Sequence, residues 1–257
     1  MDSSSSASIL HKYFQHTLII QYFCFLILGY KQSRTEEAIE KNKVKKQLRL
    51  GLVDRALRSL PPSIGELTHL EELNLQNNEL STLPDTLTAL TNLSMLNLGV
   101  NRFTTIPASV LALANSLQWL NLGFNQLTTI PSGFSELNNL AYLNMSYNRL
   151  TSISSVVYSI TSLKELYFSN NQIRVISPGI GALTNLELLY CSYNNLTILP
   201  PDLYKCSRLT DMGANNNPLQ HPPPYLLSTS HRLGYLRYLA KGHGFGDADD
   251  DDHSENT

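Results

Sequence analysis

The chain of 257 residues contains few cysteines and few charged residues. Its three cysteines, Cys24, Cys191 and Cys206, are an odd number without paired spacing, whereas secreted domains usually depend on clustered, paired cysteines. We therefore expect a reducing, cytoplasmic environment. Charged residues make up only 16% of the chain and the formal net charge is -2, which excludes strong electrostatic attraction to nucleic acid.

Motifs that carry catalysis are also missing. The sequence has no glycine-rich phosphate loop, no G-x-S-x-G, no H-E-x-x-H and no C-x-x-C, and its seven histidines are scattered. An enzyme needs chemical groups that converge on one site. We therefore expect that the protein is not an enzyme and that it has no catalytic residues, no metal site and no cofactor.

No apolar run is long enough to be an obvious membrane span. The longest, from Leu18 to Tyr30, is interrupted by Gln21 and is shorter than the roughly 20 residues that a spanning helix needs. Residues 1–34 form an uncertain hydrophobic leader: a signal peptide, a signal anchor, a helix that covers the next domain and an upstream extension all stay open. Membrane association through residues 17–30 is a less favoured alternative to the cytoplasmic location.

The chain does contain an internal repeat. The segment LEELNLQNNELSTLPDTLTALTN, which begins at Leu70, is followed directly by LSMLNLGVNRFTTIPASVLALAN, which has the same length. The consensus is L-x-x-L-x-L-x-x-N-x-L-x-x-L-P-x-x-L-x-x-L-x-x, and a degenerate first copy with Arg55 in place of asparagine brings the total to eight repeats. The ninth-position asparagines are Asn78, Asn101, Asn125, Asn148, Asn171, Asn194 and Asn217. The interval from Asn101 to Asn125 is longer than the others by a single residue, which we place in an outer loop.

This pattern predicts an α/β solenoid. Each L-x-L segment forms a short strand, and stacked repeats make a curved parallel sheet on the concave face, with irregular or short helical turns on the convex face. The ninth-position asparagines would be buried where the chain leaves the strand. There they would satisfy backbone groups of neighbouring repeats, so we assign them a structural role.

Residues 47–219 resemble the leucine-rich-repeat family on the strength of this consensus. The L-P-x-x-L variant, the helical lead-in TEEAIEKNKVKKQLRL and the closing NPLQHPPPYLLSTSHRLGYLRYLAK resemble its intracellular members, of the Ras-suppressor and plant Ras-group type. Ser154 and Ser177 depart from the consensus proline. The resemblance implies a non-catalytic adaptor or scaffold in intracellular signal transduction, with a link to small GTPases.

We divide the rest of the chain by composition. Residues 35–47 form an N-terminal capping helix, with Ser33 and Glu36 as a capping box and an apolar stripe of Ala38, Ile39 and Val44. Residues 48–219 are the repeats. Residues 220–242 form a C-terminal cap after three prolines, and residues 243–257 form a disordered acidic tail.

The candidate binding site is a set of aromatic residues on the concave face. In this repeat geometry the third, fifth, seventh and eighth positions point to solvent, and aromatic residues there match the composition of binding hot spots. We nominate Met95, Trp119, Phe124, Tyr142, Tyr147, Tyr167, Tyr190 and Tyr193 as the residues that bind a protein partner. The alternative is that these neighbours only stabilise the sheet.

Two other functions stay open at this point. A membrane-anchored or secreted recognition ectodomain would use the N-x-[ST] triplets at Asn92, Asn144 and Asn195, which we attribute to chance in a chain rich in these residues. A targeting subunit of a phosphatase or ubiquitin ligase would use the same surface. The identity of the partner does not follow from the fold.

Overall fold

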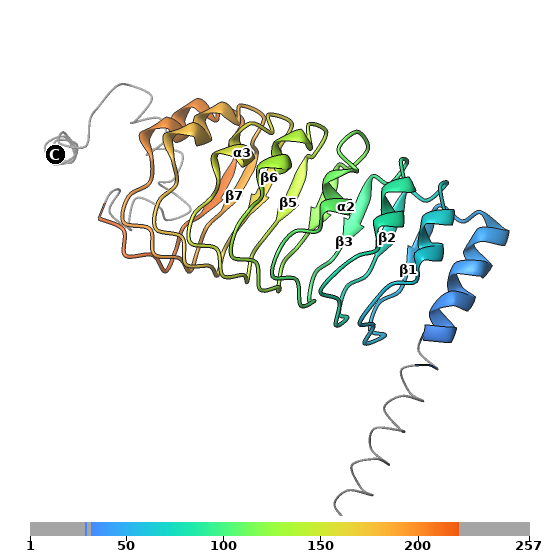
Figure 1. The fold of residues 1–257 in the computed structure, drawn as a ribbon. Coiled ribbons are helices and arrows are strands. Elements are labelled where there is room, and N and C mark those ends of the chain that lie inside the picture. The colour runs from blue at the N-terminus through green and yellow to red at the C-terminus, as the bar shows by residue number, and fades with distance from the viewer. Residues whose placement is uncertain (1–28, 30–31, 221–257) are drawn as a thin grey trace, which may run out of the picture.

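A computed structural model of the chain describes Gly29 and residues 32–220. Figure 1 shows short strands side by side in one layer and short helical turns in a second layer. The strands are β1 (Arg49–Gly51), β2 (Glu72–Asn74), β3 (Met95–Asn97), β4 (Trp119–Asn121), β5 (Tyr142–Asn144), β6 (Glu165–Tyr167), β7 (Leu188–Tyr190) and β8 (Asp211–Gly213). They form one open parallel sheet in sequence order, so the predicted solenoid of about eight repeats is confirmed.

The register of the sheet follows the repeat. Leu73 pairs with Leu96, which occupies the same position in the next repeat. Met95 pairs with Trp119 across the one longer interval, so the strands stay aligned there. The second layer of that repeat contains α2 (Ala108–Leu111), a turn of α-helix. The extra residue therefore lies in the outer layer, as predicted.

The outer layer consists of short helices that begin after an extended residue. The 3-10 helices are η1 (Pro62–Glu66), η2 (Asp85–Ala89), η3 (Ser132–Glu136), η4 (Pro178–Ala182) and η5 (Pro201–Lys205), and the second α-helix is α3 (Ser155–Tyr158). Proline precedes most of them because its fixed φ suits the extended conformation found there. Ser177 replaces the proline before η4, and its side chain accepts a hydrogen bond from the Gly179 amide at 3.3 Å.

A single apolar core fills the space between the two layers. The inward-pointing strand leucines, such as Leu96 and Leu120, are completely buried. Cys191 and Cys206 belong to the same core, where they occupy positions that hold leucine in other repeats. Burial raises the pKa of the Cys191 thiol to about 12 and that of Cys206 to about 11. Both thiols are therefore protonated and unreactive at neutral pH.

The ninth-position asparagines form the ladder that the sequence predicted. The Asn125 amide nitrogen donates to the carbonyls of Leu98 and Leu122, both at 3.0 Å, and its oxygen accepts from the Phe103 amide at 3.0 Å. Asn148 repeats this arrangement one turn further along the solenoid. Each asparagine thus joins two repeats through otherwise unpaired buried backbone groups, which confirms its structural role.

The N-terminal helix, of which residues 32–45 are described, packs against the first repeat. Ile39 is buried, and the Asn42 amide nitrogen donates to the Arg49 carbonyl at 3.0 Å. The prediction of a capping box at Ser33 is wrong, because Ser33 lies within the helix rather than before it. The predicted apolar stripe is wrong at Val44, which is 75% exposed, because the helix turns the side that carries Ile39 and Asn42 toward the repeats.

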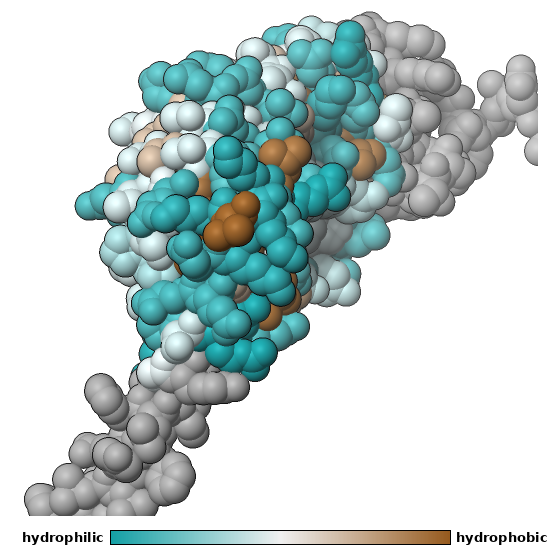
Figure 2. Space-filling model, turned by 90° about the vertical axis from the view of Figure 1, so that its right-hand side faces the viewer, coloured by the Kyte–Doolittle hydropathy of each residue, from teal (hydrophilic) through white to brown (hydrophobic). Residues whose placement is uncertain are grey.

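Figure 2 shows this N-terminal end of the molecule, whose surface is mostly hydrophilic with small separate hydrophobic spots. Within the described residues, no helix combines the length and the apolar character needed to cross a membrane. Most of the leader 1–34, including all of the segment 17–30 except Gly29, lies outside the described residues, as do nearly all of the cap 220–242 and the tail 243–257. The predictions made for them stay predictions.

Candidate functional site

The outward side of the sheet, here called the sheet face, carries the third, fifth and seventh positions of each repeat, with the eighth position at its edge. Alternation along a strand puts the leucines inward and the third and fifth positions outward. Every strand from β2 to β8 shows this alternation, with a buried central residue between two partly exposed ones.

Four aromatic rings form a continuous row across β4, β5, β6 and β7, here called the aromatic lane: Trp119, Tyr142, Tyr167 and Tyr190. The Trp119 and Tyr142 rings are stacked, with centroids 4.6 Å apart, and so are Tyr167 and Tyr190, at 5.3 Å. Between these pairs, Tyr142 and Tyr167 lie 5.3 Å apart with planes tilted by 40°. Met95 precedes Trp119 in the third-position column. The fold brings these five predicted residues together.

A second aromatic group lies at the eighth positions. Phe124 and Tyr147 stack with centroids 3.9 Å apart, and their side chains are 52% and 47% exposed. Tyr193 has the same position two repeats further on and is 57% exposed. These three predicted residues are thus separate from the aromatic lane, and Tyr193 does not stack with the other two.

The eighth position has a backbone conformation that the sequence analysis did not foresee. Its φ lies between 54° and 57° in every repeat from the second to the eighth. Asparagine tolerates this left-handed conformation and is present at Asn77, Asn170 and Asn216. Its recurrence at the eighth position is the sequence signal from which the conformation could have been predicted. Phe124, Tyr147 and Tyr193 instead hold large side chains there, at a cost of about 1 kcal/mol each. Exposed aromatics in a strained conformation are not explained by folding.

Asparagines at the fifth position also have a structural role that sequence reasoning missed. The side-chain oxygens of Asn97, Asn121 and Asn144 accept from the backbone amide two residues later, at 2.9–3.0 Å. Tyr167 and Tyr190 occupy the same position and have no amide oxygen to make this contact. Tyr167 and Tyr190 thus each replace a residue that stabilises the local backbone.

Two of the three tyrosine hydroxyls in the aromatic lane donate to carboxylates. The Tyr167 hydroxyl donates to Oε2 of Glu165 at 2.7 Å, and the Tyr190 hydroxyl donates to Asp211. Burial and the neighbouring Glu165 carboxylate raise the pKa of Tyr167 well above its usual value. Burial also raises the pKa of Tyr142. Tyr142 and Tyr167 are therefore neutral at physiological pH.

Gly213 leaves room for the ring of Tyr190. A Cβ atom on Gly213 would lie 2.7 Å from Cδ1 of Tyr190, which is closer than two carbon atoms can approach. Because glycine has no Cβ atom, the Tyr190 ring can lie across β8 at the Gly213 position.

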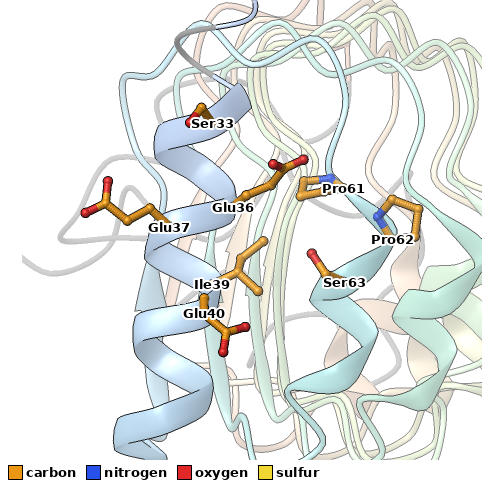
Figure 3. Close-up of a pocket in the computed structure, with 8 residues that line it drawn as sticks. All are labelled: Ser33, Glu36, Glu37, Ile39, Glu40, Pro61, Pro62 and Ser63. Carbon is orange, nitrogen blue, oxygen red and sulfur yellow. The ribbon is translucent and has the colours of Figure 1, made fainter.

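Two surface clefts lie elsewhere. One, of about 630 Å³, is formed by the N-terminal helix and residues Pro61 to Ser63, with Ile39 at its base (Figure 3). The other, of about 250 Å³, lies in the outer layer of the sixth and seventh repeats and includes Val175 and Ile198. Neither cleft contains a residue nominated from the sequence. Within the described residues, no cluster of histidine, cysteine or acidic side chains could hold a metal ion.

Comparison with protein families identifies the repeat. The model described as "Leucine rich repeat" matches residues 49–103 and 91–150, and the model described as "Leucine Rich repeats (2 copies)" matches residues 161–204. Together these segments cover more than half of the chain. No curated protein matches the sequence.

Solved structures with the same fold include proteins of bacteria and plants. A leucine-rich-repeat protein of Leptospira interrogans is 32% identical over 75% of this chain and 53% of its own, with a TM-score of 0.68. An internalin of Listeria monocytogenes is 28% identical over 65% of this chain and 48% of its own, at 0.56. The ectodomain of the Arabidopsis thaliana receptor kinase GASSHO1, in complex with Casparian strip integrity factor 2, is 27% identical over 67% and 21%, at 0.60. The chain thus spans about half of the two bacterial proteins and less of the plant receptor.

Proposed function

Because the chain belongs to the leucine-rich-repeat proteins, which generally bind other proteins, we propose that it is a cytoplasmic, non-catalytic adaptor that binds a protein partner on its sheet face. The observation that carries this proposal is the aromatic lane, a row of four partly exposed rings on an open sheet. A link to small-GTPase signalling belongs to the same proposal and rests on the L-P-x-x-L form of the repeat.

Stacking alone does not account for the aromatic residues. A stacked pair contributes about 0.5–1.5 kcal/mol, so the lane does stabilise the sheet. Phe124 and Tyr147, however, stack in a strained conformation and stay about half exposed. Tyr193 bears the same strain without a stacked partner among the described rings. A partner that covers these side chains would supply the stabilisation that folding does not.

A capture experiment tests the proposed surface. A variant with Trp119→Ala, Tyr142→Ala and Tyr167→Ala is compared with wild type for proteins retained from a cell lysate. The control variant carries Val175→Ala, Ile198→Ala and Tyr204→Ala, which also removes three exposed apolar side chains but away from the sheet face. Circular dichroism first shows that both variants fold.

We expect the sheet-face variant to lose a specific protein that wild type and the control variant both retain. Retention of the same proteins by all three chains would contradict the proposal. It would direct attention to the ends of the solenoid or to outer-layer residues that the control variant leaves unchanged.

A recognition ectodomain is the second candidate, and it draws support from the internalin and the plant ectodomain with the same fold. The glycosylation triplet at Asn144 weighs against it. A glycan on Asn144 would lie on the sheet face beside Tyr142 and Tyr167 and would cover part of the aromatic lane. A mobility shift after enzymatic deglycosylation of the chain from its own cells would favour the ectodomain.

A further inference from the structure

The sheet face carries acidic but no basic side chains from the second repeat to the eighth. At the third, fifth, seventh and eighth positions of these repeats there is no lysine, arginine or histidine, although the chain contains 19 lysines and arginines. The acidic residues at these positions are Glu72, Glu165 and Asp211. The surface that we propose for binding is therefore complementary to a partner with positive charge.

Glu165 differs from Glu72 in its surroundings. Glu72 accepts from Nε of Arg49 at 3.1 Å, so a cation of the first repeat already pairs with it. Glu165 makes no ion pair in the part of the chain that the structure describes. Its Oε2 accepts the Tyr167 hydroxyl, which holds the carboxylate in place.

Two tyrosine rings flank this carboxylate. Tyr142 pairs with Glu165 in the sheet register, and Tyr167 lies two residues after it on β6. The two rings are 5.3 Å apart and tilted by 40°, so a wedge opens between their facing sides, while their other sides stack on Trp119 and Tyr190. The electron-rich face of a tyrosine attracts cations, most of all guanidinium groups.

We propose that Tyr142, Glu165 and Tyr167 receive an arginine side chain of the protein partner. A planar guanidinium can stack on a tyrosine ring while its N–H groups donate to a carboxylate, and both surfaces are present here. Lysine fits less well, because its compact and strongly hydrated ammonium offers no flat face to the ring. This inference rests on the proposed function and adds to it the chemistry of the group that is recognised.

The test uses the full chain with carbon-13 labelled tyrosines, observed by nuclear magnetic resonance. The probes are N-acetyl-arginine amide and N-acetyl-citrulline amide, which share shape and size but differ in charge. We expect the arginine amide to shift the ring signals of Tyr142 and Tyr167 in a saturable way. The citrulline amide should leave them unchanged.

Glu165→Gln is the matched variant, because its side chain can still accept the Tyr167 hydroxyl. We expect it to weaken binding of the arginine amide at least about fivefold, since a charge-assisted hydrogen bond becomes a neutral one. Glu72→Gln is the control and should bind the probe like wild type. Equal shifts with both probes, or unchanged binding by Glu165→Gln, would overturn the inference.

The result of the magnetic-resonance experiment is independent of the result of the capture experiment. If the sheet-face variant loses a partner while the arginine amide shifts no tyrosine signal, the proposed function stands and the arginine inference fails. If the arginine amide binds but the sheet-face variant captures the same proteins as wild type, the proposed function fails at this surface.

Discussion

The side chains at the eighth position show how a single residue can reveal what folding does not require. Every repeat from the second onward needs a left-handed backbone there, and asparagine meets that need in three of them. Val100, Phe124, Tyr147 and Tyr193 occupy the same conformation with side chains that disfavour it. The aromatic residues among them are exposed enough to contact a partner, whereas Val100 is only partly exposed.

Replacing Val100 by asparagine should therefore stabilise the protein. A β-branched side chain at φ 55° clashes with its own backbone, and asparagine relieves this at a gain of about 1 kcal/mol. The free energy of unfolding, measured by urea denaturation, should rise by that amount with an unchanged dependence on urea concentration.

The reverse change provides the control. Asn170→Val places a β-branched residue at φ 57° and should lower the stability by about 1 kcal/mol. A loss of stability in Val100→Asn would mean that its side chain packs more favourably than its backbone is strained. The argument from strain at Phe124 and Tyr147 would then fail as well.

At the scale of elements, the repeat predicted the strands, their order and their register because each depends on leucines at fixed spacing. The same spacing predicted the asparagine ladder, because a buried side-chain amide at the end of each strand must form hydrogen bonds with neighbouring backbone groups. It did not predict whether an outer turn is a 3-10 helix or an α-helix. The length of the repeat does not decide it, because α2 lies in the longer repeat whereas α3 lies in a repeat of ordinary length.

The aromatic residues of the candidate site could be placed on one face from the sequence, but their geometry could not. Tyr142 and Tyr167 stand in different columns, third and fifth, and meet only because their rings lean across the strands. The prediction of the contact face of the N-terminal helix was wrong for a related reason. Its contact face is set by polar contacts such as that of Asn42 with Arg49, which apolar spacing does not reveal.

Deleting Ser116 tests how independent the outer layer is from the sheet. Ser116 lies in the turn between the buried Leu113 and Leu117, and its removal gives this repeat the same length as its neighbours. We expect a stability change below about 1 kcal/mol and an unchanged circular dichroism spectrum, because loops absorb such changes cheaply. The variant's urea denaturation curve provides the measurement.

A deletion in a strand should behave differently. Removing Asn121 from β4 would move Leu122, the next inward leucine, to the outward side of the sheet. We expect this chain to lose cooperative unfolding. If deletion of Ser116 is equally damaging, the turn of α2 contributes to the core and is more than a spacer.

At the scale of the whole molecule, each strand pairs only with its neighbours in sequence, from β1 to β8. Stability in such a solenoid is nearly a sum of repeats and of the interfaces between them. Damage at one end should therefore stay local, while damage at the centre separates two shorter stacks. The aromatic lane lies on β4 to β7, away from the N-terminal end.

Leu52→Ala and Leu122→Ala compare these two cases. Both leucines occupy the sixth position of a repeat, both are completely buried, and each substitution removes the same atoms at a local cost of about 2–5 kcal/mol. Hydrogen exchange should accelerate only in β1 and β2 for Leu52→Ala but in all strands for Leu122→Ala. Leu52→Ala should also keep its partner in the capture experiment. If both variants accelerate exchange everywhere, the solenoid unfolds as one unit and the binding surface depends on the first repeat after all.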